Sequence, residues 1–217
     1  PRAMPAMFER MYRQTRLRAE SLPEYLSTHP LSETRISDTL GRANQYPEKH
    51  FSDDLEFHLC KNMIIVDYAE TKTAAIKHFN GIIERGNSTQ IEAAKFGLAY
   101  AKLETDSKQA IKLLEELLAQ HPTKISLNII LARALQSAGN KQKATDKLEY
   151  LLERNPNNYS VSRALADIYL ENNELQKSEA SLGQLSKHYP EDPEVWYLLA
   201  EVNGLSGNIV ELHQARA

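Results

Sequence analysis

The stretch that decides the fold is residues 125–158, ISLNIILARALQSAGNKQKATDKLEYLLERNPNN. It contains two apolar patterns of helical period, separated by a turn at Gly139 and closed by Pro156. Pro122 and Pro190 close the neighbouring segments in the same way, so three prolines stand 34 residues apart. A fixed period of this length indicates a repeat of two helices, and such repeats stack into a solenoid.

The spacing of small and large residues resembles the tetratricopeptide repeat. In 125–158, Leu131 and Ala132 fall at positions 7 and 8, Ala144 at position 20 and Leu148 at position 24. The unit 159–192 repeats the pattern with Leu165, Ala166, Tyr169, Ser178 and Leu182. Small residues at positions 8 and 20 let the paired helices approach closely. We therefore expect Ala132, Ala144 and Ala166 to be buried where helices cross.

Two earlier units and one later unit extend the array less regularly. Gly97 falls at position 8 of one unit, which needs an extra residue near 105–107 to join its two halves. Phe79 sits at position 24 of a unit that starts near Glu56. A last unit begins at Pro193 and stops within its second helix. Atypical terminal units are expected of a solenoid, because they meet something other than another repeat.

The sequence thus predicts an all-α fold, a tetratricopeptide-repeat (TPR) helical solenoid preceded by an N-terminal helical segment. The solenoid is expected over 54–217, with about four and a half repeats, and the helical segment over 1–50. Both ends are expected to be cut, since the chain begins at Pro1 and stops partway through a repeat. An uncovered apolar face around Ile209, Val210 and Leu212 would then favour weak self-association.

Composition excludes several classes of protein. The chain has 217 residues, 41% of them hydrophobic and 25% charged, which is enough to bury a core. A net charge of -3 gives no reason to expect a nucleic-acid partner. The longest apolar stretches, such as 63–66, are too short to cross a bilayer. The single cysteine, Cys60, forms no internal disulfide, and its place on an apolar helix face predicts a buried small hydrophobe.

The first fifty residues carry a second set of motifs. Residues 3–17 form an amphipathic pattern with a basic flank from Arg10 to Arg18, in which acidic residues interleave. This flank favours a solvated helix face, or one packed on another domain, over a membrane surface. Thr28-His29-Pro30 follows, and then a short helical pattern that contains Arg35-Ile36.

The Thr-His-Pro segment, the following Arg-containing helix and then the repeats resemble periplasmic zinc metalloproteases of the BepA (YfgC) type. The resemblance implies that residues 1–50 are the C-terminal end of a protease domain with linker helices. It also implies a periplasmic location, zinc as the cofactor of the parent protein, and a role in outer-membrane protein assembly and quality control. The parent would be a zinc metalloendopeptidase, with this chain as the part after its catalytic motif.

The sequence contains no His-Glu-x-x-His, so no catalytic residue is predicted and this chain is not expected to be an enzyme. That motif places two imidazoles on zinc and a glutamate beside the attacking water. His29 has two interpretations. It shapes the turn before Pro30, or, as the resemblance implies, it is a regulatory zinc ligand in the full-length parent.

The candidate binding site is the concave face of the solenoid. There, positions 2, 5, 9 and 12–13 of the first helix in each repeat point inward. In the regular units the predicted groove residues are Ser126, Ile129, Arg133, Gln136, Arg163, Asp167, Leu170, Glu171, Tyr197 and Glu201. Arg133 and Arg163 are expected on neighbouring helices, where they would contact acidic groups of a partner.

Two functions remain open. One is a protein-binding TPR region of a periplasmic zinc metalloprotease, which docks onto the outer-membrane assembly machinery or an unfolded outer-membrane protein substrate. The other is a stand-alone TPR scaffold or co-chaperone that binds a peptide and is unrelated to proteolysis. The gene sequence upstream of Pro1 separates them, because the first function requires a signal peptide and His-Glu-x-x-His there.

Overall fold

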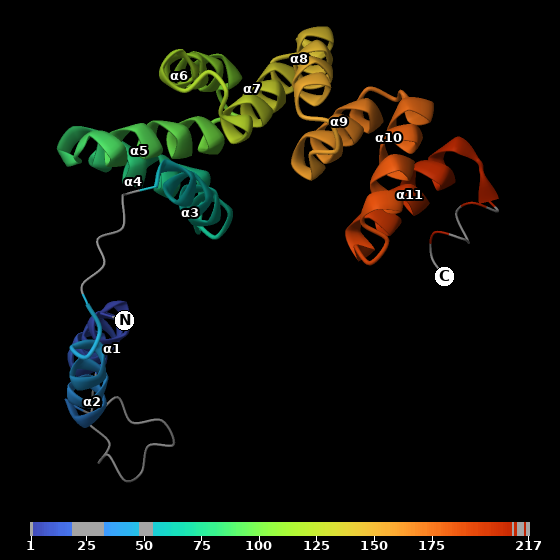
Figure 1. The fold of residues 1–217 in the computed structure, drawn as a ribbon. Helices are drawn as coiled ribbons and strands as arrows, with labels where there is room; N and C mark the ends of the chain where they lie inside the picture. Colours follow the sequence, from blue (N-terminus) through green and yellow to red (C-terminus); the bar gives the residue numbers. More distant parts are fainter. Residues whose placement is uncertain (1, 19–32, 48–53, 210, 212–214, 216–217) are drawn as a thin grey trace. The chain divides into compact units, whose positions relative to one another are not determined.

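The structure is a computed structural model that divides into two compact units, 1–52 and 53–217 (Figure 1). The described residues are 2–18, 33–47, 54–209, 211 and 215. Every regular element in these ranges is an α-helix, which confirms the predicted fold class. None of the helices in these ranges is both long enough and apolar enough to cross a membrane.

The first unit contains two helices, α1 (Ala3–Arg18) and α2 (Glu33–Ala43), which pack on each other. The Tyr12 hydroxyl donates to Glu33 Oε1 at 2.9 Å, and the Arg35 guanidinium lies 5.3 Å from the centre of the Phe8 ring. The predicted helix at 3–17 is therefore present. Of its basic flank, the side chains of Arg16 and Arg18 lie outside the described part, as do Thr28, His29 and Pro30.

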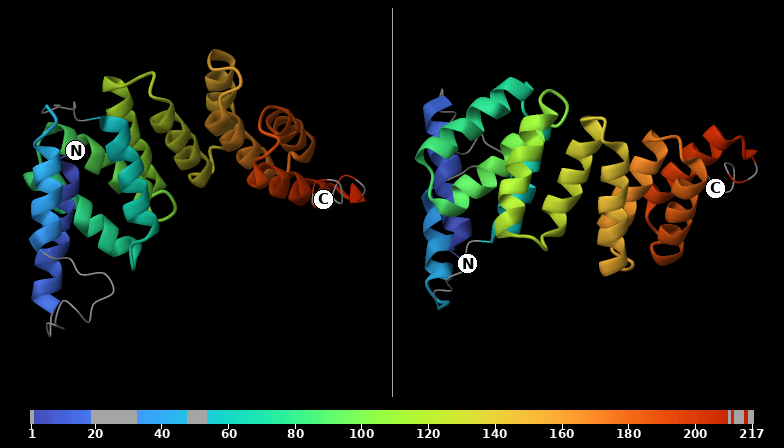
Figure 2. Two further views of the ribbon diagram at one scale, coloured as in Figure 1. Left: turned by 60° about the horizontal axis from the view of Figure 1, so that its bottom comes forward. Right: turned by 90° about the horizontal axis from the view of Figure 1, so that it is seen from above.

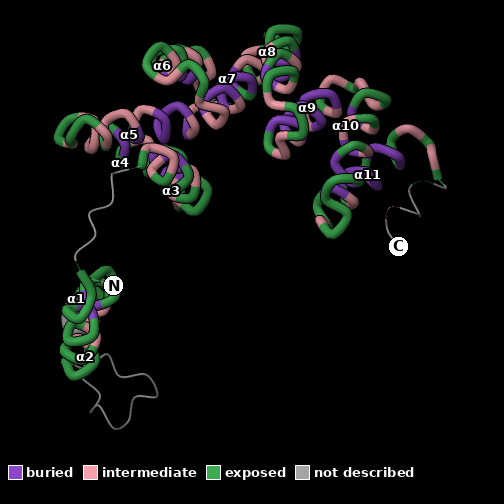
Figure 3. Tube along the Cα trace, viewed as in Figure 1, coloured by how far each residue is buried: buried purple, intermediate pink, exposed green. Residues whose placement is uncertain are grey.

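The second unit is a chain of nine described helices, each packed on the next (Figures 1 and 2). They are α3 (Leu55–Asp67), α4 (Lys72–Arg85), α5 (Ser88–Ala101), α6 (Ser107–Gln120), α7 (Ile125–Ser137), α8 (Lys141–Arg154), α9 (Tyr159–Glu171), α10 (Leu175–His188) and α11 (Pro193–Ser206). The odd-numbered helices from α3 to α11 are the first helices of the repeats, and α4, α6, α8 and α10 are the second helices. Buried residues concentrate along α5, α7, α9 and α11 (Figure 3).

The 34-residue period is visible in the backbone as well as in the sequence. Within the last repeats, Gly139, Asn173 and Gly207 follow the first helix at 34-residue intervals, with φ of 80°, 61° and 77°. A left-handed residue ends the helix and turns the chain, and asparagine tolerates this conformation better than most residues other than glycine. Asn173 therefore takes the place of a glycine at the equivalent position.

Two of the three repeat-ending prolines, Pro122 and Pro190, accept a hydrogen bond from the helix that follows. Trp196 Nε1 donates to the carbonyl of Pro190 at 2.7 Å, and Asn128 Nδ2 donates to the carbonyl of Pro122 at 3.2 Å. Asn128 and Trp196 both stand at position 4 of their repeats. In these two repeats, a side chain with an N–H donor at position 4 thus links the turn to the helix that follows.

Small residues separate the paired helices, as the sequence predicts. Ala132, Ala144 and Ala166 are all essentially inaccessible to solvent, which confirms their predicted burial. In the irregular repeats, Gly97 is the small residue that lets the paired helices pack closely. A Cβ atom there would lie 2.5 Å from Cζ of Phe79. Gly97 therefore allows α4 and α5 to approach with a buried phenyl ring between them.

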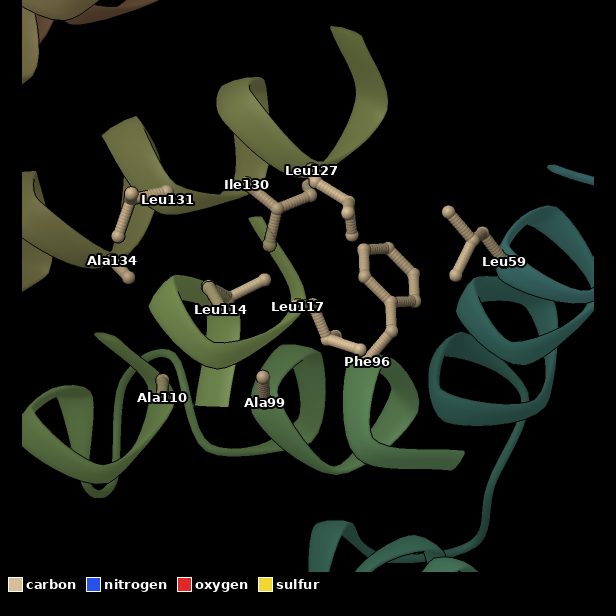
Figure 4. Packing of buried hydrophobic residues seen from close by; sticks show 10 residues of the cluster. All are labelled: Leu59, Phe96, Ala99, Ala110, Leu114, Leu117, Leu127, Ile130, Leu131 and Ala134. Carbon is tan, nitrogen blue, oxygen red and sulfur yellow. The ribbon is translucent and has the colours of Figure 1, made fainter. Parts of the chain in front are cut away.

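The buried clusters of the core extend across repeats rather than staying within single repeats. Leu59 from α3, Phe96 from α5, Leu114 from α6 and Leu127 from α7 meet in one buried cluster (Figure 4). Further clusters join α8 to α9 and α10 to α11. Because each cluster draws on neighbouring repeats, an isolated repeat would expose the apolar face that its neighbour covers.

The prediction for Cys60 is wrong, because Cys60 is exposed on α3. The apolar face of that helix is buried through Leu59 and Val66 instead. The expected uncovered face at the end of the chain is only partly described. Ile209 is exposed, while Val210 and Leu212 lie outside the described residues, so self-association stays a prediction.

Candidate functional site: a groove along the first helices

A hollow of about 740 Å³ runs along the first helices of the second unit. Its walls come from α3, α7, α9 and the start of α11, together with the turns that precede α7 and α9. We call this hollow the groove. Its size is within the range of ligand-binding clefts, and its several contributing repeats give it the length to hold a segment of polypeptide.

One part of the groove is apolar. Cys60 and Met63 project from α3, Ile129 from α7 and Ala164 from α9. Cys60 is exposed, and Met63 and Ile129 are partly so, which leaves apolar surface accessible to a partner. We call these four residues the apolar lining. Met and Ile side chains at an accessible site favour the burial of an apolar partner group.

The groove also contains charged residues, and four charged side chains from three helices meet in it. Arg163 Nε lies 3.1 Å from Asp167 Oδ1, and Arg163 Nη1 lies 3.1 Å from Glu194 Oε1. Arg133 Nη2 approaches the other oxygen of Asp167, Oδ2, at 3.6 Å. We call Arg133, Arg163, Asp167 and Glu194 the Asp167 cluster. It links α7, α9 and α11, so the charges also tie consecutive repeats together.

Arg163 is the fixed member of this cluster. Burial alone would lower the pKa of its guanidinium, but the attraction of Asp167 and the hydrogen bonds to Asp167 and Glu194 raise that pKa above its usual value. Its side chain is 20% exposed, against 44% for Arg133. The cluster therefore holds one well-anchored arginine and one that is more accessible.

Polar contacts continue at both edges of the groove. Glu56 Oε2 accepts from Ser126 Oγ at 3.2 Å and lies 3.0 Å from Lys124 Nζ, which joins α3 to the start of α7. The Tyr159 hydroxyl donates to Asp192 Oδ2 at 2.6 Å. That hydrogen bond is the main reason why the pKa of Asp192 lies below its usual value.

Tyr100 on α5 interacts with charged side chains of α3 and α7. Burial raises the pKa of the Tyr100 phenol, and the charge of Asp67 and a hydrogen bond to it raise that pKa further. The positive charge of Arg133 acts in the opposite sense on the same phenol. Asp67, Tyr100 and Arg133 therefore interact across α3, α5 and α7.

The structure brings together only some of the predicted groove residues. Ser126, Ile129 and Arg133 line the groove from α7, and Arg163 and Asp167 line it from α9. These are positions 2, 5 and 9 of the two regular repeats. Whether they bind a partner stays a prediction.

The remaining predicted residues lie elsewhere. Gln136 Nε2 donates to Asn172 Oδ1 at 2.9 Å, and Leu170 packs on the buried cluster of the last repeats. Tyr197 and Glu201 are exposed on α11, and neither they nor Glu171 lines the groove. Positions 12–13 fall at the far end of each first helix, beyond the hollow. The groove also ends at the first turn of α11, before Tyr197.

Sequence reasoning missed groove residues on α3 and on α11. Cys60 stands at position 5 of the unit that starts at Glu56, and Glu194 stands at position 2 of the last unit. Applying the position rule to the irregular units would have found both. Lys124 and Tyr159 belong to the turns before the first helices, where a rule based on helix positions has no signal.

The described residues do not provide a metal site. Within the ranges 2–18, 33–47 and 54–209, no three His, Cys, Asp or Glu side chains gather closely enough to hold a metal ion. His29, the predicted regulatory ligand, lies outside those ranges.

Comparison with known families identifies the repeats. Sequence profiles of the tetratricopeptide repeat match residues 93–124 and 137–202. A solved thermophilic TPR protein of Thermus thermophilus superposes with a TM-score of 0.58 at 20% identity, covering 75% of this chain and 88% of that one. MamA from Desulfovibrio magneticus RS-1 gives a TM-score of 0.51 at 12% identity, covering 77% and 92%. These likenesses support the TPR solenoid.

The curated relatives are proteases. The beta-barrel assembly-enhancing protease of Escherichia coli (strain K12) is 32% identical over 123 residues, 56% of this chain and 25% of that protein. Its Vibrio cholerae counterpart, a putative member, is 36% identical over 124 residues, 55% and 25%. The Yersinia pestis protein is 26% identical over 208 residues, 95% and 43%.

The chain thus spans between a quarter and under half of the length of these curated relatives. Homologues named beta-barrel assembly-enhancing protease cover its TPR region, which confirms the resemblance predicted from the sequence.

Proposed function

We propose that this chain is the non-catalytic, protein-binding TPR region of a periplasmic zinc-dependent metalloprotease that acts in outer-membrane protein assembly and quality control. Residues 1–50 would be the end of the protease domain with linker helices, and 54–217 the repeats. The groove would hold a polypeptide, either from the assembly machinery or from an unfolded outer-membrane protein. The homologues favour this function over a stand-alone scaffold unrelated to proteolysis.

The groove is the observation that carries this proposal. It places accessible apolar side chains, Met63 and Ile129, beside charges of both signs, Arg133 and Asp167. Such a surface suits a polypeptide that carries apolar and charged groups, because it can desolvate the first and pair the second. Stalled or unfolded chains display both kinds of group.

Zinc enters the proposal only through the parent protein. Within the part of the chain that the structure describes, no group of three His, Cys, Asp or Glu side chains fits a zinc ion. His29 is proposed as a regulatory ligand at the catalytic zinc of the full-length parent. His29→Ala in that protein is then expected to raise proteolysis of an unfolded substrate, and unchanged proteolysis would assign His29 to the turn alone.

Site-specific photo-crosslinking tests the binding function. A photoreactive benzoylphenylalanine replaces Ser160 in the groove, or Tyr150, which is 56% exposed on the second helix α8. Each variant is mixed with a purified β-barrel assembly complex in detergent, and separately with a urea-unfolded outer-membrane β-barrel protein diluted into buffer. Crosslinks to one of these probes from position 160 but not 150 support the proposal. Equal crosslinking from both, or none from position 160, contradicts it.

A further inference from the structure

Among the described residues of the groove, the ion pairs leave one cation without a carboxylate of its own. Lys124 pairs with Glu56 at 3.0 Å, while Arg163 contacts both Asp167 and Glu194 at 3.1 Å. Three cations and three anions line the groove, yet two of the anions are engaged by Arg163. Arg133 is the cation that remains.

The contact that Arg133 does make is a weak one. Its ion pair within the described residues is with Asp167 Oδ2 at 3.6 Å, which is too long for a hydrogen bond. A guanidinium carries five N–H donors in a planar fork, and the side chain of Arg133 is 44% exposed. Asp167 is 20% exposed and already accepts from Arg163 at 3.1 Å. Arg133 can therefore turn to a new acceptor without leaving Asp167 unpaired.

The residues around Arg133 indicate which chemical groups lie next to the partner's acceptor. Ile129 lies one helical turn before Arg133 on α7, and Met63 faces the same hollow from α3. A group that reaches the guanidinium thus lies next to the apolar lining. The hollow extends from α3 on one side of α7 to α11 on the other, so a chain can pass Arg133 in both directions.

From this geometry, and resting on the proposed function, we propose that the groove recognises an internal acidic side chain flanked by apolar residues. The carboxylate of the partner's Asp or Glu accepts a bidentate pair of hydrogen bonds from Arg133, and the flanking apolar side chain covers Ile129 and Met63. Charge-assisted, forked hydrogen bonds of this kind are among the stronger polar contacts in proteins. Arg163 stays paired with Asp167 and Glu194, and the two arginines together balance the two carboxylates, so the Asp167 cluster has no net negative charge that would repel the incoming carboxylate.

The test uses the full chain and three labelled decapeptides. The first is acetylated and amidated, with a central glutamate flanked by leucines in a serine background. The second has glutamine in place of that glutamate. The third has the glutamine sequence with a free terminal carboxylate. Fluorescence anisotropy measures the Kd of each peptide for the wild-type chain, Arg133→Gln, Arg133→Lys and the matched control Arg154→Gln, whose guanidinium lies over Tyr150 on α8, away from the groove.

The glutamate peptide is expected to bind the wild-type chain about tenfold more tightly than the glutamine peptide, the difference that a charged hydrogen-bond pair supplies. Arg133→Gln should remove this difference, Arg133→Lys should keep part of it because lysine lacks the fork, and Arg154→Gln should leave it intact. Thermal melts establish that all variants are folded.

Other outcomes overturn the inference and stay distinct from failure of the proposed function. If both blocked peptides bind equally and Ile129→Asp weakens both, the groove binds polypeptide but Arg133 does not select a carboxylate. If the third peptide binds most tightly, the groove captures a chain end instead. If no peptide binds, the inference falls, while crosslinking from position 160 decides the proposed function on its own.

Discussion

The regular repeats, α7–α10, and the irregular repeats, α3–α6, solve the same packing problem with different residues. In the regular repeats, alanine or serine separates the helices, and Ser178 Oγ also donates to the carbonyl of Ala166 at 2.9 Å. In the irregular repeats, Gly97 makes room for the ring of Phe79. The chain therefore tolerates different residue pairs at a helix crossing, provided that one member is small when the other is large.

The two regions also differ in their turns. Residues 138–140 connect α7 to α8, whereas 102–106 connect α5 to α6. In the longer connection, Lys102 Nζ contacts Asp106 Oδ2 at 3.3 Å, and Asp106 caps α6 through the N–H of Gln109 at 3.2 Å. Extra residues are accommodated at the edge of the solenoid, while the crossing itself allows no such freedom.

Truncating Phe79 should have the largest effect. Phe79→Ala is expected to lower the free energy of unfolding by about 3–5 kcal/mol, because Gly97 has no side chain that could fill the cavity. Leu148 stands at the same repeat position in the regular region, and it too is fully buried. Urea denaturation of Phe79→Ala and Leu148→Ala gives the comparison. A larger loss for Leu148→Ala would show that the Gly97–Phe79 contact is not tightly packed.

Adding a side chain at Gly97 tests the same contact between Gly97 and Phe79. Gly97→Ala should cost about 1–3 kcal/mol through overpacking against Phe79. Gly183→Ala is the matched control, since a Cβ on that α10 glycine meets no atom within 4 Å and should stabilise the helix by about 0.5–1 kcal/mol. Combining Gly97→Ala with Phe79→Leu should cost less than the sum of the two single changes. Strict additivity would mean that the two side chains do not compete for space.

Overpacking a crossing of the regular region tests the repeat register. Ala144 is fully buried on α8. Ala144→Leu is expected to lower the free energy of unfolding by about 1–3 kcal/mol, with a matching fall in Tm. An unchanged Tm would show that position 20 does not lie at a helix crossing.

The smallest expected effect concerns the hydrogen bond between Tyr159, at the start of α9, and Asp192, which caps α11. The Tyr159 hydrogen bond lowers the pKa of Asp192 below its usual 3.8, so the ionised form stabilises the fold above that pH. This contribution is lost as the pH falls through the lower folded pKa. Asp192→Asn still caps α11 but does not titrate, so the Tm gap between the wild type and this variant should narrow from pH 7 to pH 3.

Tyr159→Phe provides the control for this pH dependence. Without the phenol, Asp192 loses the hydrogen bond that is the main cause of its lowered pKa. The gap between Tyr159→Phe and Tyr159→Phe/Asp192→Asn should then vary less with pH. If Asp192→Asn changes the pH dependence of Tm equally with and without Tyr159→Phe, the Tyr159 hydrogen bond is not the cause of the lowered pKa of Asp192.

The sequence predicts contacts within the repeats far better than it predicts the site. Pro156 and Ala144 belong to a pattern in which each position has one structural role, so spacing alone locates them. The groove depends instead on how first helices from different repeats lie relative to one another. That arrangement leaves Cys60 exposed and brings Arg133 to the carboxylate that Arg163 already holds. The exposure of Cys60 follows from position 5 once the rule is applied to its repeat, whereas the contact between Arg133 and Asp167 does not follow from the register of a single repeat.

The central claim is that positions 2, 5 and 9 of α7 and α9, the first helices of the two regular repeats, form one protein-binding groove. Hydrogen–deuterium exchange of the full chain, with and without a urea-unfolded outer-membrane β-barrel protein diluted into buffer, tests it directly. The account predicts slower exchange on binding in residues 125–133 and 159–167, with no change in the second helices, 141–154 and 175–188. Protection confined to the second helices, or spread evenly over both sets, would contradict it.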